Sequence, residues 1–209
     1  MRKAGISDYV AFARDVLRVV PTLPISFEVF SDDFAEMEMQ ALEMASWGSN
    51  VFVKIPITNT RGESAAPLVS RLAHAGVQLN VTAILTEAQV AEIAKALSPR
   101  TACFVSVFAG RIADTGVDPL PIIANSLALL RDLPLAEVIW ASPRELLNVF
   151  QADAVGCHVI TATADVLNKL SLVGKDLTTY SLETVEMFRK DAVAAGFTIP
   201  ISAPARGGV

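Results

Sequence analysis

Short apolar runs alternate with helix-like segments along most of this chain, and this alternation constrains the fold more than any other feature. The apolar runs predict six strands, at residues 25–30, 51–56, 78–83, 103–108, 137–141 and 157–161. Segments with apolar residues at helical spacing lie between them, joined mostly by short connections. Such alternation is typical of a parallel sheet with helices packed on it. The sequence therefore predicts an α/β fold.

The pattern alone leaves two α/β architectures open. A closed barrel needs about eight strand–helix units and commonly about 250 residues, whereas an open doubly wound sheet is complete with five or six units. This chain has 209 residues. No Gly-rich phosphate-binding motif follows the first strand, which disfavours a nucleotide-binding Rossmann domain.

Composition excludes several classes of function. An apolar share of 52% in 209 residues is enough for one core, so we expect a single domain over residues 1–209, with 203–209 as a Gly- and Pro-rich flexible tail. A net charge of −5 without a basic block disfavours nucleic acid as a partner. No apolar stretch is long enough to span a membrane, and no secretory signal opens the chain. Cys103 and Cys157 are interpreted as buried, reduced thiols, which predicts a cytoplasmic protein.

Lys54 is the unusual residue of the second predicted strand. It lies within the apolar run VFVKIP, residues 51–56. Burial favours the neutral amine, and a neutral lysine amine is a nucleophile toward carbonyl groups. The alternative interpretation is that the lysine stem lies along the sheet while its head reaches water at the strand end.

Polar residues occur near the carboxyl ends of five successive predicted strands. In both candidate architectures ligands bind at this end of the sheet. Buried polar groups need partners, so a core rarely carries them by chance. The sequence therefore predicts a polar ligand site there, built from Glu28, Lys54, Asn80, Thr82, Ser106, Arg111, Ser142 and Arg144.

The chemistry of these side chains suggests their roles. Lys54 would form a Schiff base with a ketone, and the protonated imine would accept electrons when a carbon–carbon bond breaks. Glu28 could hold a water or move its proton, or could simply pair with Lys54. Asn80 and Thr82 could bind substrate hydroxyls, or could only satisfy the local backbone.

Two arginines near strand ends suit a phosphate group. Arg111 and Arg144, together with Ser142, could donate to phosphate oxygens. A helix predicted to open at Pro143 would add backbone N–H groups and a favourable dipole. The alternative is that both arginines are solvated surface residues.

Four motifs in this order resemble the transaldolase family, and especially its short single-domain branch, which is related to fructose-6-phosphate aldolase. They are VKIP, NVT, SVFAGRI and ASPRE, and the likeness extends from MRKAG at the start to AAGF near the end. The resemblance implies a TIM-type (β/α)8 barrel that transfers a dihydroxyacetone unit between sugar phosphates through a lysine imine. Because the lysine would supply the chemistry, we expect no metal, flavin, nicotinamide or pyridoxal phosphate cofactor.

The resemblance also implies roles for individual residues. Lys54 matches the Schiff-base lysine and Glu28 the glutamate that positions the catalytic water. The remaining substrate-binding positions match Asn80, Thr82, Ser106, Phe108, Arg111, Ser142 and Arg144, although Pro143 stands where an aromatic residue is usual. The aldolase branch carries glutamine at the position of Glu28 and tyrosine at that of Phe108, so transaldolase is favoured. Aldol cleavage that releases free dihydroxyacetone is the alternative.

The family pattern places MRKAG after the second barrel strand. We therefore expect the chain to supply barrel strands three to eight, as six βα units plus a C-terminal helix. A longer native chain, a covering subunit, or a non-catalytic remnant that binds sugar phosphate would each account for this, and the first is favoured because every later motif is present. The family's short members form rings, so a homo-oligomer is expected, with Met187 and Phe188 of the last helix as a candidate contact.

Overall fold

The computed structural model of this chain describes residues 5–200, which belong to two compact units divided between Leu167 and Asn168. The first unit contains the sheet and the second contains the last long helix. The expectation of one domain stays a prediction. The predicted tail at 203–209 lies outside the described residues.

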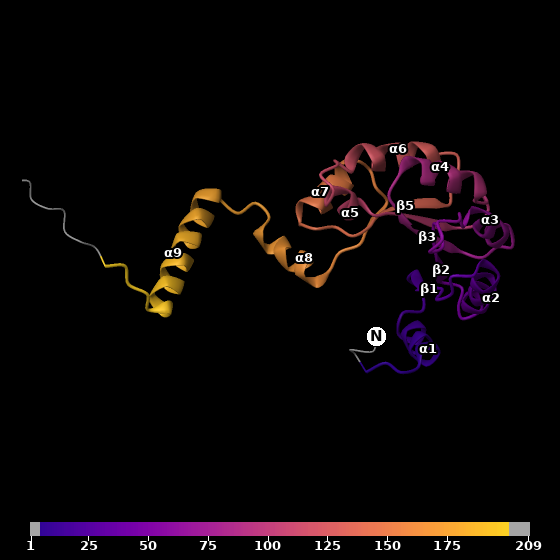
Figure 1. The fold of residues 1–209 in the computed structure, drawn as a ribbon, viewed down its shortest axis with the longest axis horizontal. Coiled ribbons are helices and arrows are strands. Elements are labelled where there is room, and N and C mark those ends of the chain that lie inside the picture. The colour runs from indigo at the N-terminus through magenta and orange to yellow at the C-terminus, as the bar shows by residue number, and fades with distance from the viewer. Residues whose placement is uncertain (1–4, 201–209) are drawn as a thin grey trace, which may run out of the picture. The chain divides into compact units, whose positions relative to one another are not determined.

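Six strands form one parallel sheet in chain order, and all six were predicted to within two residues at each end. The sheet curls into a half-barrel of the TIM type, with helices between its strands (Figure 1). Strands β1 and β6 form its two edges. The bounds are β1 (Ile25–Glu28), β2 (Val51–Pro56), β3 (Leu79–Ile84), β4 (Cys103–Val107), β5 (Ala136–Trp140) and β6 (Val159–Ile160).

Helices α2, α3, α4 and α6 contact one another in sequence, and α2, α3 and α6 also contact the sheet. Side chains cap several of them. Asp33 accepts from the N–H groups of Ala35 and Glu36 at the start of α2, and Thr86 and Gln89 form a capping box on α4. The bounds are α1 (Tyr9–Val19), α2 (Phe34–Ala45), α3 (Ala66–His74), α4 (Glu87–Ala96), α5 (Ala109–Ala113), α6 (Leu120–Leu130), α7 (Leu147–Ala154), α8 (Ala164–Asn168), the 3-10 helix η2 (Lys169–Leu172) and α9 (Leu177–Ala195).

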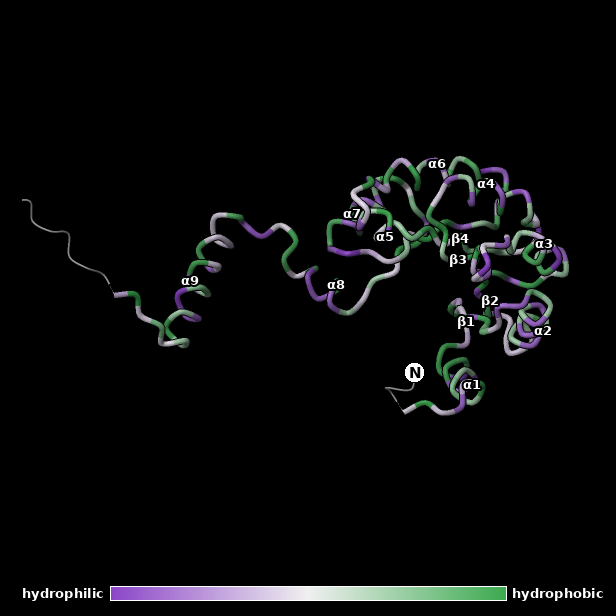
Figure 2. Tube along the Cα trace, in the orientation of Figure 1, coloured by the Kyte–Doolittle hydropathy of each residue, from purple (hydrophilic) through white to green (hydrophobic). Residues whose placement is uncertain are grey.

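Strand β2 shows how the sequence sets the two faces of the sheet. Side chains alternate along a strand, so Val51, Val53 and Ile55 point to one face and pack into the main core. Phe52 and Lys54 point to the opposite, concave face, where Phe52 stacks on Phe104 with ring centroids 4.4 Å apart. Figure 2 shows the strands as a largely hydrophobic centre of the first unit. The concave face is thus apolar in part and carries the lysine.

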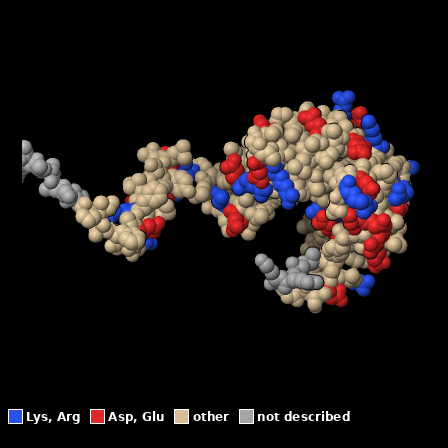
Figure 3. Space-filling view, viewed as in Figure 1, with Lys and Arg blue, Asp and Glu red and all other residues tan. Residues whose placement is uncertain are grey.

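Charged side chains of both signs are interspersed over the visible face of the first unit (Figure 3). Some of them join neighbouring helices. Arg71 of α3 donates to Glu38 of α2 with an N–O distance of 2.7 Å, and this ion pair lowers the pKa of the Glu38 carboxyl.

Two predicted helix features differ from the structure. The SLET motif predicts that the last helix begins at Ser181, but α9 begins at Leu177, because Asp176 accepts from the N–H of Thr179 and caps it there. The stretch AGRIADTGVDPLP, residues 109–121, predicts a long loop, but Ala109–Ala113 form the short helix α5 directly after β4. The glycine at position 196 predicts the end of the last helix, and α9 does end there, with Gly196 in the left-handed conformation that glycine favours.

Both cysteines are free thiols. Cys103 is buried, and desolvation raises the pKa of its thiol to about 12, so it is not a nucleophile at neutral pH. Cys157 is only half-buried, in contrast to the expectation. Over residues 5–200, every helix is too short or too polar to cross a membrane.

Candidate active site

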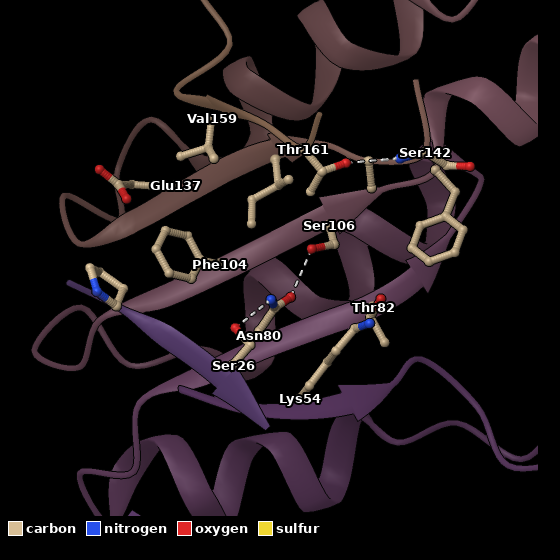
Figure 4. A pocket seen from close by; sticks show the side chains of 14 residues that line it. Ser26, Lys54, Asn80, Thr82, Phe104, Ser106, Glu137, Ser142, Val159 and Thr161 are labelled. Atoms are coloured by element: carbon tan, nitrogen blue, oxygen red, sulfur yellow. Dashed lines mark hydrogen bonds between the residues drawn. The ribbon is translucent and has the colours of Figure 1, made fainter. Parts of the chain in front are cut away.

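A cavity of about 630 Å³ opens on the concave face of the sheet, and all six strands or the residues next to them contribute to it (Figure 4). This volume lies within the usual range for small-molecule sites. Five of the predicted substrate-binding residues and Lys54 line it. The full lining is Pro24, Ser26, Lys54, Asn80, Thr82, Phe104, Ser106, Phe108, Glu137, Ile139, Ala141, Ser142, Val159 and Thr161.

Lys54 projects from β2 into this cavity (Figure 4). Its neighbours in register are Glu28 on β1 and Asn80 on β3. The Lys54 Nζ atom lies 3.5 Å from Glu28 Oε2, and the two side chains are 30% and 48% exposed. The amine is therefore open to a ligand in the cavity and to solvent, with a carboxylate beside it, rather than sealed in the core.

Asn80 joins side chains from three strands. Its Nδ2 donates to Ser26 Oγ at 2.9 Å, and its Oδ1 accepts from Ser106 Oγ at 2.7 Å (Figure 4). Ser26 lies on β1 and Asn80 on β3, so the curl of the sheet brings their side chains together across β2. Each such bond contributes about 1 kcal/mol. Asn80 thus bonds other side chains, and one N–H of its amide remains available.

Thr82 carries a buried hydroxyl for which the described residues provide no hydrogen-bond partner. It lies where the pairing of β3 with β4 shifts register between Val81 and Ile84, and the next residue, Ala83, has a φ of 62°. An unpaired buried polar group costs about 1–3 kcal/mol. A ligand hydroxyl or a water in the cavity would satisfy it.

Arg111 and Arg144 lie beside the cavity rather than in its lining. The Arg111 guanidinium carbon lies 5.2 Å from the centroid of the Phe108 ring, which does line the cavity. Arg144 Nε donates to Asp114 Oδ1 at 3.1 Å and lies 3.3 Å from where a Cβ atom on Gly110 would be. Gly110 lies with Arg111 in α5 and Asp114 follows that helix directly, so the structure brings both arginines to the same region.

The loop between β5 and α7 corrects one prediction. The sequence predicts a helix that begins at Pro143, but α7 begins at Leu147. Asn148 Oδ1 accepts from the N–H groups of Arg144 at 2.8 Å and Glu145 at 3.2 Å, and this side chain shapes the loop. The backbone N–H groups and dipole that a helix start would have offered to a phosphate are therefore not provided in this way.

Ser142 holds an uncommon backbone conformation at the cavity wall. Its φ is 61°, and its N–H donates to Thr161 Oγ1 at 3.2 Å (Figure 4). A non-glycine residue in this region costs of order 1 kcal/mol or more and persists only when its surroundings fix it. Thr161 and the close approach of Gly110 to the Ser142 carbonyl supply that constraint.

The sequence prediction missed several cavity residues. Thr161 follows β6, so the rule that selects polar residues at the carboxyl ends of strands would have found it had the sixth strand been included. Ser26 and Glu137 lie near the starts of their strands and still face the cavity, so a rule limited to the carboxyl ends of strands does not find them. Among residues 5–200, no three or more His, Cys, Asp or Glu side chains are grouped to hold a metal ion.

Comparison with known proteins shows the family to which this chain belongs. A model of the Transaldolase/Fructose-6-phosphate aldolase family matches residues 6–199. A probable transaldolase of Thermoanaerobacter sp. (strain X514) is 33% identical over 193 residues, covering 92% of this chain and 83% of that protein. A probable transaldolase of Dehalococcoides mccartyi is 34% identical over 169 residues, covering 80% and 74%.

A solved structure of a mandelate oxidase mutant resembles this chain in fold alone. Its TM-score is 0.52 at 18% sequence identity, and the match covers 87% of this chain and 60% of the oxidase chain. The family assignment depends instead on the sequence relatives and on the match across nearly the whole chain. The chain belongs to the Transaldolase/Fructose-6-phosphate aldolase family.

Proposed function

We propose that this protein is a transaldolase-type enzyme that transfers a dihydroxyacetone unit between sugar phosphates through a Schiff base on Lys54. The observation that carries the proposal is the Lys54 amine in a cavity of about 630 Å³, with the Glu28 carboxylate 3.5 Å away. The family assignment supports an aldolase or transferase activity. The lysine supplies the covalent chemistry in this proposal.

The proposed reaction begins with deprotonation of the Lys54 ammonium group, by Glu28 directly or through one water. The amine adds to the ketose carbonyl, and loss of water gives a protonated imine. The bond then breaks between the hydroxymethine carbon attached to the imine carbon and the next carbon of the sugar, which also carries a hydroxyl. Its electron pair enters the imine to give an enamine, the hydroxyl proton goes to a base, and an aldehyde leaves. The enamine adds to an acceptor aldehyde, and water releases the new ketose.

Three polar groups would bind the sugar hydroxyls. Thr82 offers a buried hydroxyl without a partner among the described residues, and Asn80 offers one remaining N–H. Ser106 Oγ donates to Asn80 Oδ1, which holds the Asn80 amide in place, and the lone pairs of Ser106 Oγ can still accept from a sugar hydroxyl. Because these groups and Lys54 line the same cavity, they would fix the ketose carbonyl near the amine.

Arg111, Ser142 and Arg144 would bind the substrate phosphate. Arg111 makes no ion pair with any residue in the described part of the chain, and its guanidinium lies over Phe108. The half-buried Ser142 links this region to the cavity. A substrate phosphate bound by these residues would hold the sugar with its carbonyl group toward Lys54.

The proposal predicts that turnover depends on an acceptor. Purified protein given a ketose phosphate and an aldose phosphate should produce the exchanged pair of sugars, measured by chromatography or a coupled assay. Without the acceptor, release of free dihydroxyacetone should fall to a small fraction of the transfer rate, because the enamine waits on the enzyme. Equal rates with and without acceptor would instead identify an aldol-cleaving enzyme. Binding of ketose phosphate without turnover under either condition would favour a non-catalytic sugar-phosphate-binding barrel.

We further propose that the protein is a homo-oligomer and works in the cytoplasm. Helix α9 has no buried residue, and Leu177, Val185 and Phe188 lie on one uncharged face of it with exposures of 78%, 59% and 62%. Met187, the other predicted contact, is 50% exposed. An exposed apolar helix face is typical of an interface between subunits. The two free thiols support a reducing compartment.

Size-exclusion chromatography with light scattering tests the oligomeric state. The wild-type protein should elute as a multiple of 22.3 kDa. Phe188→Glu should shift it toward a monomer, because the substitution places a charge on the apolar face. Lys190→Glu, on the charged side of the same helix, should leave the mass unchanged. A wild-type mass of one chain at every concentration would contradict the proposal.

A further inference from the structure

The ion pair between Arg144 and Asp114 uses one particular edge of the guanidinium. Arg144 Nε donates to Asp114 Oδ1 at 3.1 Å, and Arg144 Nη2 pairs with Asp114 Oδ2. This side-on arrangement occupies two of the five guanidinium N–H groups. The other three, on Nη1 and Nη2, remain at the far end of the side chain. That end can donate two parallel hydrogen bonds to phosphate oxygens.

Arg144 is held at both ends of its side chain. Its backbone N–H donates to Asn148 Oδ1 at 2.8 Å, which fixes the loop, and Asp114 fixes the guanidinium. The side chain is 49% exposed, so packing alone does not immobilise it. A free arginine carries about 2 kcal/mol of rotamer entropy that is lost on binding a ligand. A partner that holds the guanidinium in advance reduces this loss.

Asp114 also connects the two arginines. It follows α5 directly, and its backbone N–H donates to Gly110 O at 3.0 Å in the last turn of that helix. Arg111 lies within α5, whereas Arg144 lies in the loop after β5. The Asp114 side chain therefore ties the loop of one arginine to the short helix of the other.

A carboxylate near a phosphate site could also weaken binding by repulsion. Here the carboxylate lies on the Nε edge and is 52% exposed, so water and salt screen its charge from a ligand at the opposite end. Orientation of the guanidinium then outweighs the repulsion. We propose that Asp114 is a positioning residue that holds Arg144 for the substrate phosphate, an inference that rests on the phosphate site of the proposed function.

Calorimetric titration with inorganic phosphate tests this inference, because binding is measured without turnover. Asp114→Ala should weaken phosphate binding by about tenfold, because the released Arg144 side chain then loses rotamer entropy when it binds. Arg144→Ala should weaken it at least as much. In the Arg144→Ala background, adding Asp114→Ala should change nothing further, since Asp114 acts only through Arg144. Asp15→Ala, which removes a carboxylate from the ion pair with Arg18 on α1, is the matched control and should bind like wild type.

Three results would overturn the inference. They are unchanged or tighter phosphate binding by Asp114→Ala, an equal loss with and without Arg144, and wild-type protein that binds no phosphate. A second experiment tests the proposed function separately. It traps the imine on Lys54 by borohydride reduction with unphosphorylated dihydroxyacetone, which needs no phosphate site. If the imine is trapped on Lys54 but Asp114→Ala does not change phosphate binding, only the positioning role is overturned. Asp114-dependent phosphate binding without trapping supports the positioning role and contradicts the Schiff-base chemistry.

Discussion

Lys54→Ala is expected to reduce the transfer rate by about 10³-fold or more, because the covalent route through the imine disappears with the amine. The fold should survive. Lys54 is 30% exposed and its ion-pair partner Glu28 is 48% exposed, so loss of this pair changes the free energy of unfolding little. Initial rates of sugar exchange and urea unfolding of both proteins measure the two effects.

Lys95→Ala provides the matched control for this substitution. Lys95 lies in the last turn of α4, away from the residues that line the cavity, and its loss should leave the transfer rate at the wild-type level. A Lys54→Ala protein that keeps more than about a tenth of the wild-type rate would show that the lysine is not the nucleophile.

Gly110→Ala is expected to destabilise the protein and to disrupt the proposed phosphate site. A Cβ atom at this position would lie 1.6 Å from Ser142 O and 2.7 Å from Ser142 C. Both are backbone atoms, so no side-chain rotation relieves the overlap, and α5 or the loop after β5 must move. We expect a loss of about 2–4 kcal/mol in the free energy of unfolding. The KM for a ketose phosphate should rise as Arg111 and Arg144 separate.

Gly48→Ala is the control for the glycine change. A Cβ atom there would meet the flexible Asn50 side chain at 3.0 Å, and the backbone of Gly48, like that of Gly110, is outside the left-handed region. Gly48→Ala should lower the free energy of unfolding by less than Gly110→Ala does, and its KM for a ketose phosphate should equal that of the wild type. Wild-type stability and wild-type KM in Gly110→Ala would contradict the close packing of the two loops.

The sheet and the orientation of Lys54 could be predicted because both depend on local sequence. Six apolar runs mark the strands, and the period of two along VFVKIP places Lys54 on the face opposite to Val53 and Ile55. The strand-end rule named the polar residues of the site, and the family resemblance added Phe108. Thr82 and Ser106 line the cavity, and their substrate-binding role stays a prediction.

Features that depend on individual side-chain contacts could not be predicted. The expected helix at Pro143 does not form, and the nearby Asn148 side chain accepts from the N–H groups of Arg144 and Glu145 instead. The bonds from Asn80 to Ser26 and Ser106 require the curl of the sheet, and the ion pair of Arg144 requires the short helix that ends just before Asp114. Such contacts between side chains leave no periodic signal in the sequence.

Reduction with borohydride in the presence of a ketose phosphate tests the central claim most directly. The amine of Lys54 must lie within reach of a carbonyl carbon in the cavity, so the reduced imine should appear as one stable adduct of the sugar unit. Peptide mapping by mass spectrometry should place it on Lys54 and should find none in Lys54→Ala. No adduct on the wild-type protein, or an adduct spread equally over surface lysines such as Lys95, would contradict the account.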